Sequence, residues 1–403
     1  MRIAVITTSF PDKEHNYIWA WMQELSRRGF WIDIFTEKIN FSARQTEYFN
    51  DPLLWSRIHT FANPIHLFDM TPDCFYQSIS SLRFPSRIAN MVAYLRKNER
   101  KTRTVFRKTF EYLPWIKEKY DLVHINHSRI AARRLELGEI IQSRTLVSFR
   151  GQDLTLRPGL FGPIFDRADH IHFISKYLYE QAVQQGYNKD NYSIISPIVD
   201  TSFFSPENVV SQPQSSFKNN HAMIFTSAKL RWQKGYEFAI KAVDLLIKRG
   251  WKIDYFIAGD GENSEEVEYT IRDLHLEDAV HLLGWLDISE VRNWMRKADL
   301  YLLCSVEDGF NNSVLQAQAC GLPCVVTDAN GLPENIEDGV TGLLASRRDP
   351  HDIADKIEAL LSDPKRRIEM GHAGRERAVK LFDISIVNDQ FEALYRRLCG
   401  GNG

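Results

Sequence analysis

Short runs of β-branched and aromatic residues alternate with amphipathic stretches along nearly the whole chain, and few folds accommodate that pattern. Such alternation predicts parallel sheets covered by helices. In the first half we expect strands at 2–7, 31–36, 122–125, 145–149 and 170–174, and helices at 17–28, 130–141 and 176–185. In the second half we expect strands at 222–227, 252–258, 280–283, 300–304 and 324–327, with helices between them and a last helix at 384–398.

A polar stretch separates the two series. Residues 205–220, SPENVVSQPQSSFKNN, have the composition of a linker. A chain of 403 residues also suits two cores better than one. We therefore expect an α/β protein with two Rossmann-like doubly wound domains, residues 1–205 and 206–382, whose strand carboxyl ends face a cleft. Residues 383–403 are expected to form a helix that packs back on the first domain.

Composition excludes several classes of protein. Hydrophobic residues make up 44% and charged residues 25%, which is typical of a globular protein. No apolar run approaches the ~18 residues of a membrane span, and the first run is shorter than the ~7–15 residues of a signal-peptide core. Five cysteines without a CxxC pair argue against a disulfide framework or a zinc site. We expect a cytoplasmic protein without a metal.

Charge is unevenly distributed. Residues 1–205 hold 27 Lys/Arg and 21 Asp/Glu, a net of +6, and the remaining 23 Lys/Arg and 31 Asp/Glu give −8. The basic half indicates an anionic partner. Residues 96–119 hold nine Lys/Arg, three Glu and several aromatic residues. This stretch fits a basic helix on the inner face of an anionic membrane, or a solvated helix whose apolar stripe packs in the core.

Residues 305–342, SVEDGFNNSVLQAQACGLPCVVTDANGLPENIEDGVTG, form the most informative segment. An acidic turn containing Gly309 follows an expected strand, and a helix is expected to begin near Asn312. Asn311, Asn312 and Ser313 are residues that can cap this helix, whose free N–H groups suit a diphosphate. A plain strand–turn–helix connection explains the spacing equally well.

The segment resembles the donor-site signature of the retaining, GT-B-fold glycosyltransferases of family 4, also called group 1. In that signature an acidic residue, Gly-Phe and a second acidic residue eight positions on precede Ala-x-Ala-x-Gly-x-Pro. Here Asp308 stands in place of the usual first Glu, unless Glu307 serves by a one-residue shift, and Gln316 stands in place of the second. Gly309 with Phe310 and residues 317–323 complete the signature. The resemblance implies that Asp308 contacts the donor sugar and that Gln316 holds the ribose. A neutral amide can still donate to and accept from hydroxyls.

Two further turns extend the resemblance. Residues 227–235, SAKLRWQKG, are similar to a family loop whose two cations bind the diphosphate, and residues 283–285 match a turn that often touches the base. The similarity is specific from residue 222 to about 382. The donor-binding residues that it implies are Lys229, Lys234, Gly284, Gly309, Phe310, Asn311, Asn312 and Gln316.

The expected first domain carries one candidate for the reaction centre. Residues 121–127, DLVHINH, resemble a family strand that ends in His-x-x-His or His-x-His. The resemblance places His127 near the anomeric carbon. His124 alternates into the strand and is expected to pack in the core.

Residues 148–153, SFRGQD, resemble the family's Thr-x-His-Gly-x-Asp, with Arg150 in place of His. Arg150 and Asp153 are therefore candidate contacts to an acceptor or a phosphate, although Asp153 could instead cap the next turn. The turn at residues 9–17 contains no glycine, which excludes a GxGxxG nicotinamide site after the first strand.

The resemblance implies a retaining transfer of a sugar from a UDP- or GDP-type donor to a hydroxyl, in polysaccharide or glycolipid synthesis. Asp308 and His127 would be the catalytic residues, without metal or cofactor. Expected partners are the nucleotide sugar, a carbohydrate or lipid-linked acceptor and an anionic membrane surface, and no nucleic acid. The alternatives are a non-catalytic relative that acts as a binding or partner subunit, and a soluble-sugar transferase or phosphorylase.

Overall fold

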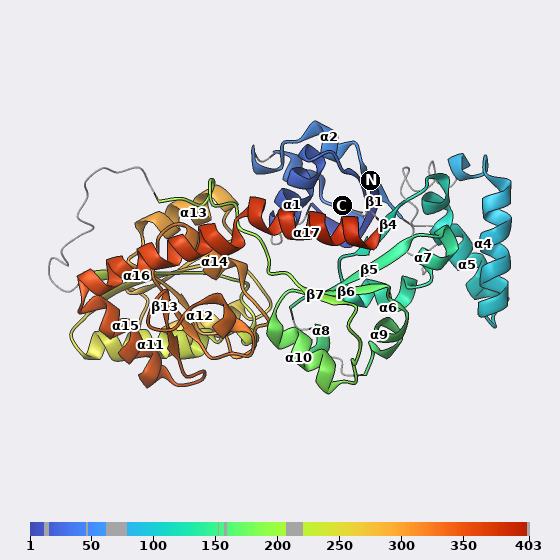
Figure 1. The fold of residues 1–403 in the computed structure, drawn as a ribbon. Helices are drawn as coiled ribbons and strands as arrows, with labels where there is room; N and C mark the ends of the chain where they lie inside the picture. Colours follow the sequence, from blue (N-terminus) through green and yellow to red (C-terminus); the bar gives the residue numbers. More distant parts are fainter. Residues whose placement is uncertain are drawn as a thin grey trace. The chain divides into compact units, whose positions relative to one another are not determined.

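The computed structural model describes residues 1–11, 16–45, 47–61, 79–151, 153–156, 159–206 and 221–400 (Figure 1). The chain divides into two compact units. Unit 1 comprises residues 1–174, 179–195 and 388–403, and unit 2 comprises residues 175–178 and 196–387. Each unit is built on one parallel sheet with helices around it, so the predicted α/β class is confirmed.

The sheet of unit 1 has seven strands in the order β3-β2-β1-β4-β5-β6-β7. All six neighbouring pairs are parallel. The strands are β1 Arg2–Phe10, β2 Trp31–Ile39, β3 Ile58–Thr60, β4 Leu122–Ile125, β5 Arg144–Phe149, β6 His170–Phe173 and β7 Tyr192–Ile194. The order reverses between β1 and β4, so the ends of β4 and β5 lie beside a topological switch point. β3 and β7 were not predicted, because three residues carry too little periodicity.

The helices that accompany this sheet are α1 Asn16–Arg27, α2 Pro52–Trp55, α4 Pro85–Asn98, α5 Thr102–Tyr112, α6 Ser128–Arg134, α7 Leu137–Ile141, α8 Asp153–Leu156, α9 Gly162–Arg167 and α10 Lys176–Gln184. The single helix predicted over 130–141 is wrong, since α6 and α7 are separate. Gly138 in α7 lies so close to β5 that a Cβ there would meet Thr145 Oγ1 at 1.9 Å. The helix therefore ends before α7 begins, and α7 can pack closely on the sheet because Gly138 has no side chain.

The C-terminal helix α17, Ile384–Leu398, packs on unit 1 through its last three turns. Phe391 lies 4.9 Å from Trp21 between ring centroids, and the hydroxyl of Tyr395 lies 2.7 Å from Nδ1 of the fully buried His124. His124 is thus a core residue, as predicted.

His124 belongs to a buried hydrogen-bonded chain that crosses the sheet. His172 Nε2 lies 2.7 Å from the carbonyl oxygen of Ile195, which can only accept, so this nitrogen donates and Nδ1 of His172 accepts. Nδ1 therefore receives the hydroxyl proton of Ser148 at 2.8 Å, and Ser148 Oγ accepts from His124 Nε2 at 2.6 Å. Nδ1 of His124 is left to accept from Tyr395. Both imidazoles are neutral in this arrangement, and burial, which lowers the pKa of each, favours that form.

The sheet of unit 2 has six parallel strands in the order β10-β9-β8-β11-β12-β13. They are β8 His221–Ser227, β9 Lys252–Ala258, β10 Val280–Gly284, β11 Leu300–Leu303, β12 Cys324–Thr327 and the unpredicted β13 Gly342–Ala345. The helices are α11 Tyr236–Lys248, α12 Ser264–Asp273, α13 Ile288–Lys297, α14 Asn312–Ala319, α15 Pro350–Leu361 and α16 Pro364–Arg377.

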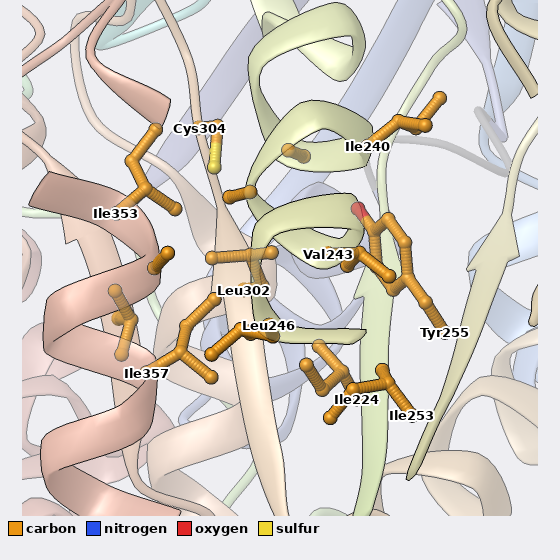
Figure 2. Close-up of a cluster of buried hydrophobic side chains, with 14 of the residues drawn as sticks. Ile224, Ile240, Val243, Leu246, Ile253, Tyr255, Leu302, Cys304, Ile353 and Ile357 are labelled. Carbon is orange, nitrogen blue, oxygen red and sulfur yellow. The ribbon is translucent and has the colours of Figure 1, made fainter. Parts of the chain in front are cut away.

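The core of unit 2 lies between its sheet and the helices α11 and α15. Figure 2 shows Val243 and Leu246 of α11 together with Ile357 of α15 around the strand residue Leu302, and all four side chains are fully buried. Strands with apolar residues in succession, such as LYLL in β11, are buried on both faces as expected for a parallel sheet. This core holds the strand ends in fixed positions, and the loops after them carry the candidate site.

The basic stretch 96–119 is not one helix. α4 ends at Asn98, α5 begins at Thr102, and the 3₁₀ helix η3 covers Leu113–Lys117. Trp115 is fully buried, 4.9 Å from Phe35 and 5.1 Å from Phe61 between ring centroids. Trp115, together with its buried neighbours in η3, therefore belongs to the core, and its interpretation as a membrane anchor is wrong. Within the described ranges, no helix has the length and apolar character needed to cross a bilayer.

Candidate functional site

The loops that follow β8, β11 and β12 in unit 2 are packed backbone to backbone. A Cβ on Gly235, after β8, would lie 2.1 Å from the carbonyl oxygen of Cys304, after β11. A Cβ on Gly331, after β12, would lie 2.0 Å from the carbonyl oxygen of Gly309. Only glycine allows these approaches. The three loops therefore form one surface at the carboxyl edge of the sheet.

Asp308 lies at the centre of this surface. Its side chain is nearly buried, and its Oδ2 accepts hydrogen bonds from Lys234 Nζ at 2.6 Å, Asn311 Nδ2 at 3.0 Å and Ser305 Oγ at 3.2 Å. The N–H of Gly331 also donates to its backbone carbonyl at 2.8 Å. Lys234 ends the 3₁₀ helix η4, Trp232–Lys234. Two residues that the sequence predicted separately, 74 positions apart, thus form one ion pair.

The start of α14 is capped by Asn311. Its Oδ1 accepts from the N–H of Ser313 at 2.9 Å and from that of Val314 at 3.4 Å. Of the three residues predicted as caps, Asn311 makes these bonds, because only it precedes the helix with an extended backbone (φ −124°, ψ 119°). Asn312 lies half-buried in the first turn.

Two other predicted donor residues lie on or next to α14. Gln316 is 8% exposed, one turn into the helix. Phe310 is 7% exposed and its ring lies 5.9 Å from that of Phe382. The Phe310 side chain therefore packs inside unit 2, and its backbone, next to Gly309, is the part that borders the site.

Lys229 and Gly284 lie at the same edge of the sheet. Lys229 is half-buried in the loop after β8, and Gly284 ends β10 with a left-handed φ of +68°. Backbone hydrogen bonds hold these loops together: the N–H of Gly259 donates to Gly284 at 2.8 Å, and that of Leu230 donates to Asp260 at 3.1 Å.

In unit 1, His127 lies two residues after the end of β4 and is the half-buried N-cap residue of α6. Arg150 follows β5 and turns inward: Nε and Nη2 donate to Asn126 Oδ1 at 3.1 and 2.8 Å, and Nη1 donates to the hydroxyl of Tyr17 at 3.3 Å. The guanidinium therefore fixes the residue before His127. Two partners of Arg150 were not predicted from the sequence. Asn126 could have been proposed from its place directly before His127, but nothing in the sequence pointed to Tyr17.

Asp153 lies beside this cluster and is also buried. Its Oδ2 accepts from the backbone N–H of Arg150 at 3.1 Å, so it caps the turn before α8. Burial raises the pKa of the Asp153 carboxyl, and a hydrogen bond from Ser128 opposes that shift.

In the turn predicted at residues 9–17, positions 12–15 lie outside the described residues.

The family model described as "Glycosyl transferases group 1" matches residues 210–377, which include every predicted donor-binding residue. These residues belong to the group 1 glycosyl transferases. The glycosyltransferase prediction is thereby confirmed at the level of the family. His127, Arg150 and Asp153 lie outside the matched range.

Relatives of this chain are similar at moderate identity. D-inositol 3-phosphate glycosyltransferase from Pseudarthrobacter chlorophenolicus is 32% identical over 203 residues, which is 48% of this chain and 47% of the relative. The chain thus spans about half the length of that relative. N-acetyl-alpha-D-glucosaminyl L-malate synthase from Bacillus anthracis is 25% identical over 69% of this chain and 75% of its own. Amylovoran biosynthesis glycosyltransferase AmsK from Erwinia amylovora is 25% identical over 69% of this chain and 70% of its own.

Solved structures show the fold of the whole chain. A glycosyltransferase from Rickettsia africae superposes with a TM-score of 0.72 at 15% identity, covering 100% of this chain and 99% of the other. HepE from Anabaena, solved with UDP and glucose, gives a TM-score of 0.71 at 17% identity, covering 98% and 99%. The predicted GT-B fold is confirmed.

Proposed function

We propose that the protein transfers a sugar from a nucleotide-diphosphate donor to a hydroxyl of a carbohydrate or lipid-linked acceptor, with retention of the anomeric configuration. The observation that carries the proposal is the cluster of Lys234, Asp308 and Asn311 on packed loops at the carboxyl edge of the unit 2 sheet. It combines a cation, a carboxylate and a helix start within hydrogen-bonding distance. Those are the groups that a diphosphate and a sugar hydroxyl need.

Each group has a chemical task in this proposal. Charge develops on the departing diphosphate, and fixed cations lower the barrier by stabilising that charge. Lys234 and Lys229, which lie in the same loop, supply this fixed positive charge. Asp308 accepts a hydrogen bond from a hydroxyl of the donor sugar, and Gln316 bonds the ribose through its neutral amide.

His127 contributes to the reaction centre from unit 1. It follows the carboxyl end of a parallel strand beside the switch point, where ligands of open α/β sheets bind. Arg150 and Asp153 support this turn, and neither is required to contact a phosphate for the proposal to hold.

Comparisons support a UDP-type donor and a role in polysaccharide or glycolipid synthesis. The HepE structure contains UDP and glucose, and AmsK is named for amylovoran biosynthesis. The sharpest first test is the unfolding midpoint with UDP, GDP or ADP. A ligand at about 100 times its Kd adds about 2.7 kcal/mol of stability, which is a shift of several degrees for units of this size.

The outcomes separate the alternatives. Binding followed by transfer from the matching nucleotide sugar supports the proposal, and a screen of soluble against lipid-linked acceptors separates the acceptor classes. Binding without donor hydrolysis or transfer would instead establish a non-catalytic binding subunit, a role that the Asp308 and Gln316 substitutions of the family's acidic pair make worth testing. No response to any of the three nucleotides would contradict donor binding.

We further propose that unit 1 is peripheral on an anionic membrane in the cytoplasm. α4 and α5 lie side by side (Figure 1), and residues 79–107 carry eight Lys/Arg against one acidic residue, Glu99. Glu99 is already paired with Lys108. Phe106 and Leu82 are 55% and 63% exposed, so residues 79–107 expose apolar side chains as well as cations.

Each basic residue at an anionic surface is worth up to ~1 kcal/mol, so five or six give reversible binding. Sedimentation with phosphatidylserine vesicles, against phosphatidylcholine vesicles, tests this at low salt and at ~1 M salt, where screening removes the attraction. A variant with three exposed cations changed to Gln should pellet less: Arg100, Lys101 and Arg103. A matched control removes three exposed cations of unit 2: Lys241, Lys252 and Lys365. Equal pelleting of both variants would refute membrane binding through this surface.

A further inference from the structure

Asn335 is a fully buried amide that holds a backbone segment of the candidate donor site. It ends the 3₁₀ helix η5, Leu332–Asn335. Its Nδ2 donates to the carbonyl oxygen of Asn311 at 2.8 Å, and its Oδ1 accepts from the N–H of the same residue at 3.0 Å. One side chain therefore satisfies both backbone groups of Asn311.

Only an amide can make this pair of bonds. The carbonyl of Asn311 needs a donor and its N–H needs an acceptor, and Asn offers both on one planar group. A carboxylate would lack the donor, and an apolar side chain would lack both. Either replacement leaves a buried backbone group of Asn311 without its hydrogen-bond partner, which is unfavourable.

The backbone of Asn335 is itself fixed. Its carbonyl oxygen accepts from Arg377 Nη1 at 2.6 Å and from Gln318 Nε2 at 3.1 Å. Arg377 also donates to the carbonyl of Glu334 at 2.8 Å. Side chains from α14 and α16 thus hold the η5 turn, so the Asn335 amide is a rigid support and not a loose contact.

Asn311 transmits this support to the site. Its Nδ2 bonds the carboxylate of Asp308, and its Oδ1 caps α14. Asp308 in turn bonds Lys234. The position of Asn311 therefore sets the helix start, the carboxylate and, through it, the ammonium group.

We propose that Asn335 is a positioning residue for the diphosphate end of the donor. The proposal rests on the proposed function, because it assigns a supporting residue to the same site. Asn335 does not touch the donor and acts through Asn311. A misplacement near 1 Å can cost on the order of 100-fold in reaction rate. The groups that Asn311 positions face the diphosphate in the proposed function, so loss of the amide should weaken diphosphate binding much more than nucleoside binding.

The experiment compares Asn335→Leu with Asn335→Asp and with a matched control, Asn388→Leu. Asn388 is an equally buried amide on α17 and belongs to unit 1, so it undergoes the same chemical change without contacting Asn311. Calorimetry measures the affinity of each protein for UDP and for uridine, and thermal unfolding measures stability. If GDP or ADP stabilises wild type instead of UDP, that nucleotide and its nucleoside replace UDP and uridine as the probes.

Asn335→Leu should lower UDP affinity about 10- to 100-fold and leave uridine affinity within about twofold. Asn335→Asp should lie between it and wild type, because it keeps the bond from the Asn311 N–H. Asn388→Leu should lose stability without changing either affinity. Equal losses for UDP and uridine, or an unchanged UDP affinity in a folded variant, would overturn the positioning role.

If Asn335→Leu does not fold, Asn335→Asp tests the proposal, again by comparing the loss of UDP affinity with the loss of uridine affinity. If wild type binds no nucleoside diphosphate, the proposed function fails, and that result is separate from a variant that merely behaves like wild type.

Discussion

Replacing Gly331 by Ala should force apart two loops of the candidate donor site. Gly331 has φ −87° and ψ −4°, which any L-residue adopts, so the backbone itself does not require glycine. Space is the constraint. The new Cβ would lie 2.0 Å from the carbonyl oxygen of Gly309 and 2.8 Å from its carbonyl carbon.

The size of the effect follows from those distances. Cβ atoms essentially never approach a heavy atom within 3.0 Å, so one loop must move by about 1 Å, the difference between that limit and the 2.0 Å above. Both partners are backbone, and the N–H of Gly331 is hydrogen-bonded to Asp308 at 2.8 Å. Overpacking of this kind costs about 1–3 kcal/mol of stability. A 1 Å displacement beside Asp308 should lower transfer on the order of 100-fold.

Gly162→Ala is the matched control. Gly162 begins α9, has no positive φ, and a Cβ there meets nothing within 4 Å. It should leave nucleotide binding unchanged and stabilise the protein slightly, by about 0.4–1 kcal/mol. The assay is thermal unfolding with a titration of the nucleoside diphosphate that wild type binds. A Gly331→Ala protein with the midpoint and affinity of wild type would refute the packed-loop arrangement.

Further changes test the remaining assignments. Lys234→Ala should weaken nucleoside-diphosphate binding by about 1–3 kcal/mol and spare the nucleoside; equal calorimetric losses for both would exclude a diphosphate contact. His127→Ala should lower turnover at least about 100-fold in a folded protein, and near-normal kinetics would make it a structural cap. Gln316→Leu should weaken donor binding while Gln316→Glu retains it; identical affinities would remove Gln316 from the ribose. Burial, then the charge of Arg150, lowers the pKa of His172 to about 3, and burial lowers that of His124 well below its ordinary value near 6.5. Because the unfolded chain binds these protons first, the stability that the neutral pair contributes is present above pH 6.5 and falls below it by about 1.4 kcal/mol per pH unit for each group, down to about pH 3 for His172; denaturation midpoints that stay flat from pH 6.5 to 4.5 would contradict the neutral chain.

Strands could be predicted from the sequence wherever they were long and apolar. β9 and β12 have the predicted bounds: β12 is a fully buried apolar run, and buried residues alternate with more exposed ones along the first part of β9. β3 and β7 span three residues each. Such short strands form because a neighbouring strand offers hydrogen-bonding partners, and no local pattern records that.

The grouping of residues at the candidate donor site was predictable where those residues follow strands. Lys234 and Asp308 stand after β8 and β11, and adjacent parallel strands bring their carboxyl ends together. Asn335 gave no such signal. Its partner Asn311 lies 24 residues away, and the pairing exists only because η5 folds against the start of α14.

Trp115 and Arg150 show the same limit for side-chain direction. Aromatic and basic residues in series fitted a membrane helix, yet Trp115 is fully buried beside Phe35. Arg150 matched a ligand-facing position, yet its guanidinium bonds Asn126. Composition determines that such groups need a partner, and the surrounding packing selects which one.

By itself, the sequence determined two parallel α/β units, the strand ends that carry polar residues and the family of the second half, because periodicity and motif spacing are local properties of the chain. Only the tertiary structure decided which polar groups meet. The contacts of Asp308 with Lys234, of Asn335 with Asn311, and of Tyr395 with His124 join residues 74, 24 and 271 positions apart. Their geometry depends on how helices and loops pack over the sheets, and buried donors and acceptors take whichever partners that packing brings within reach.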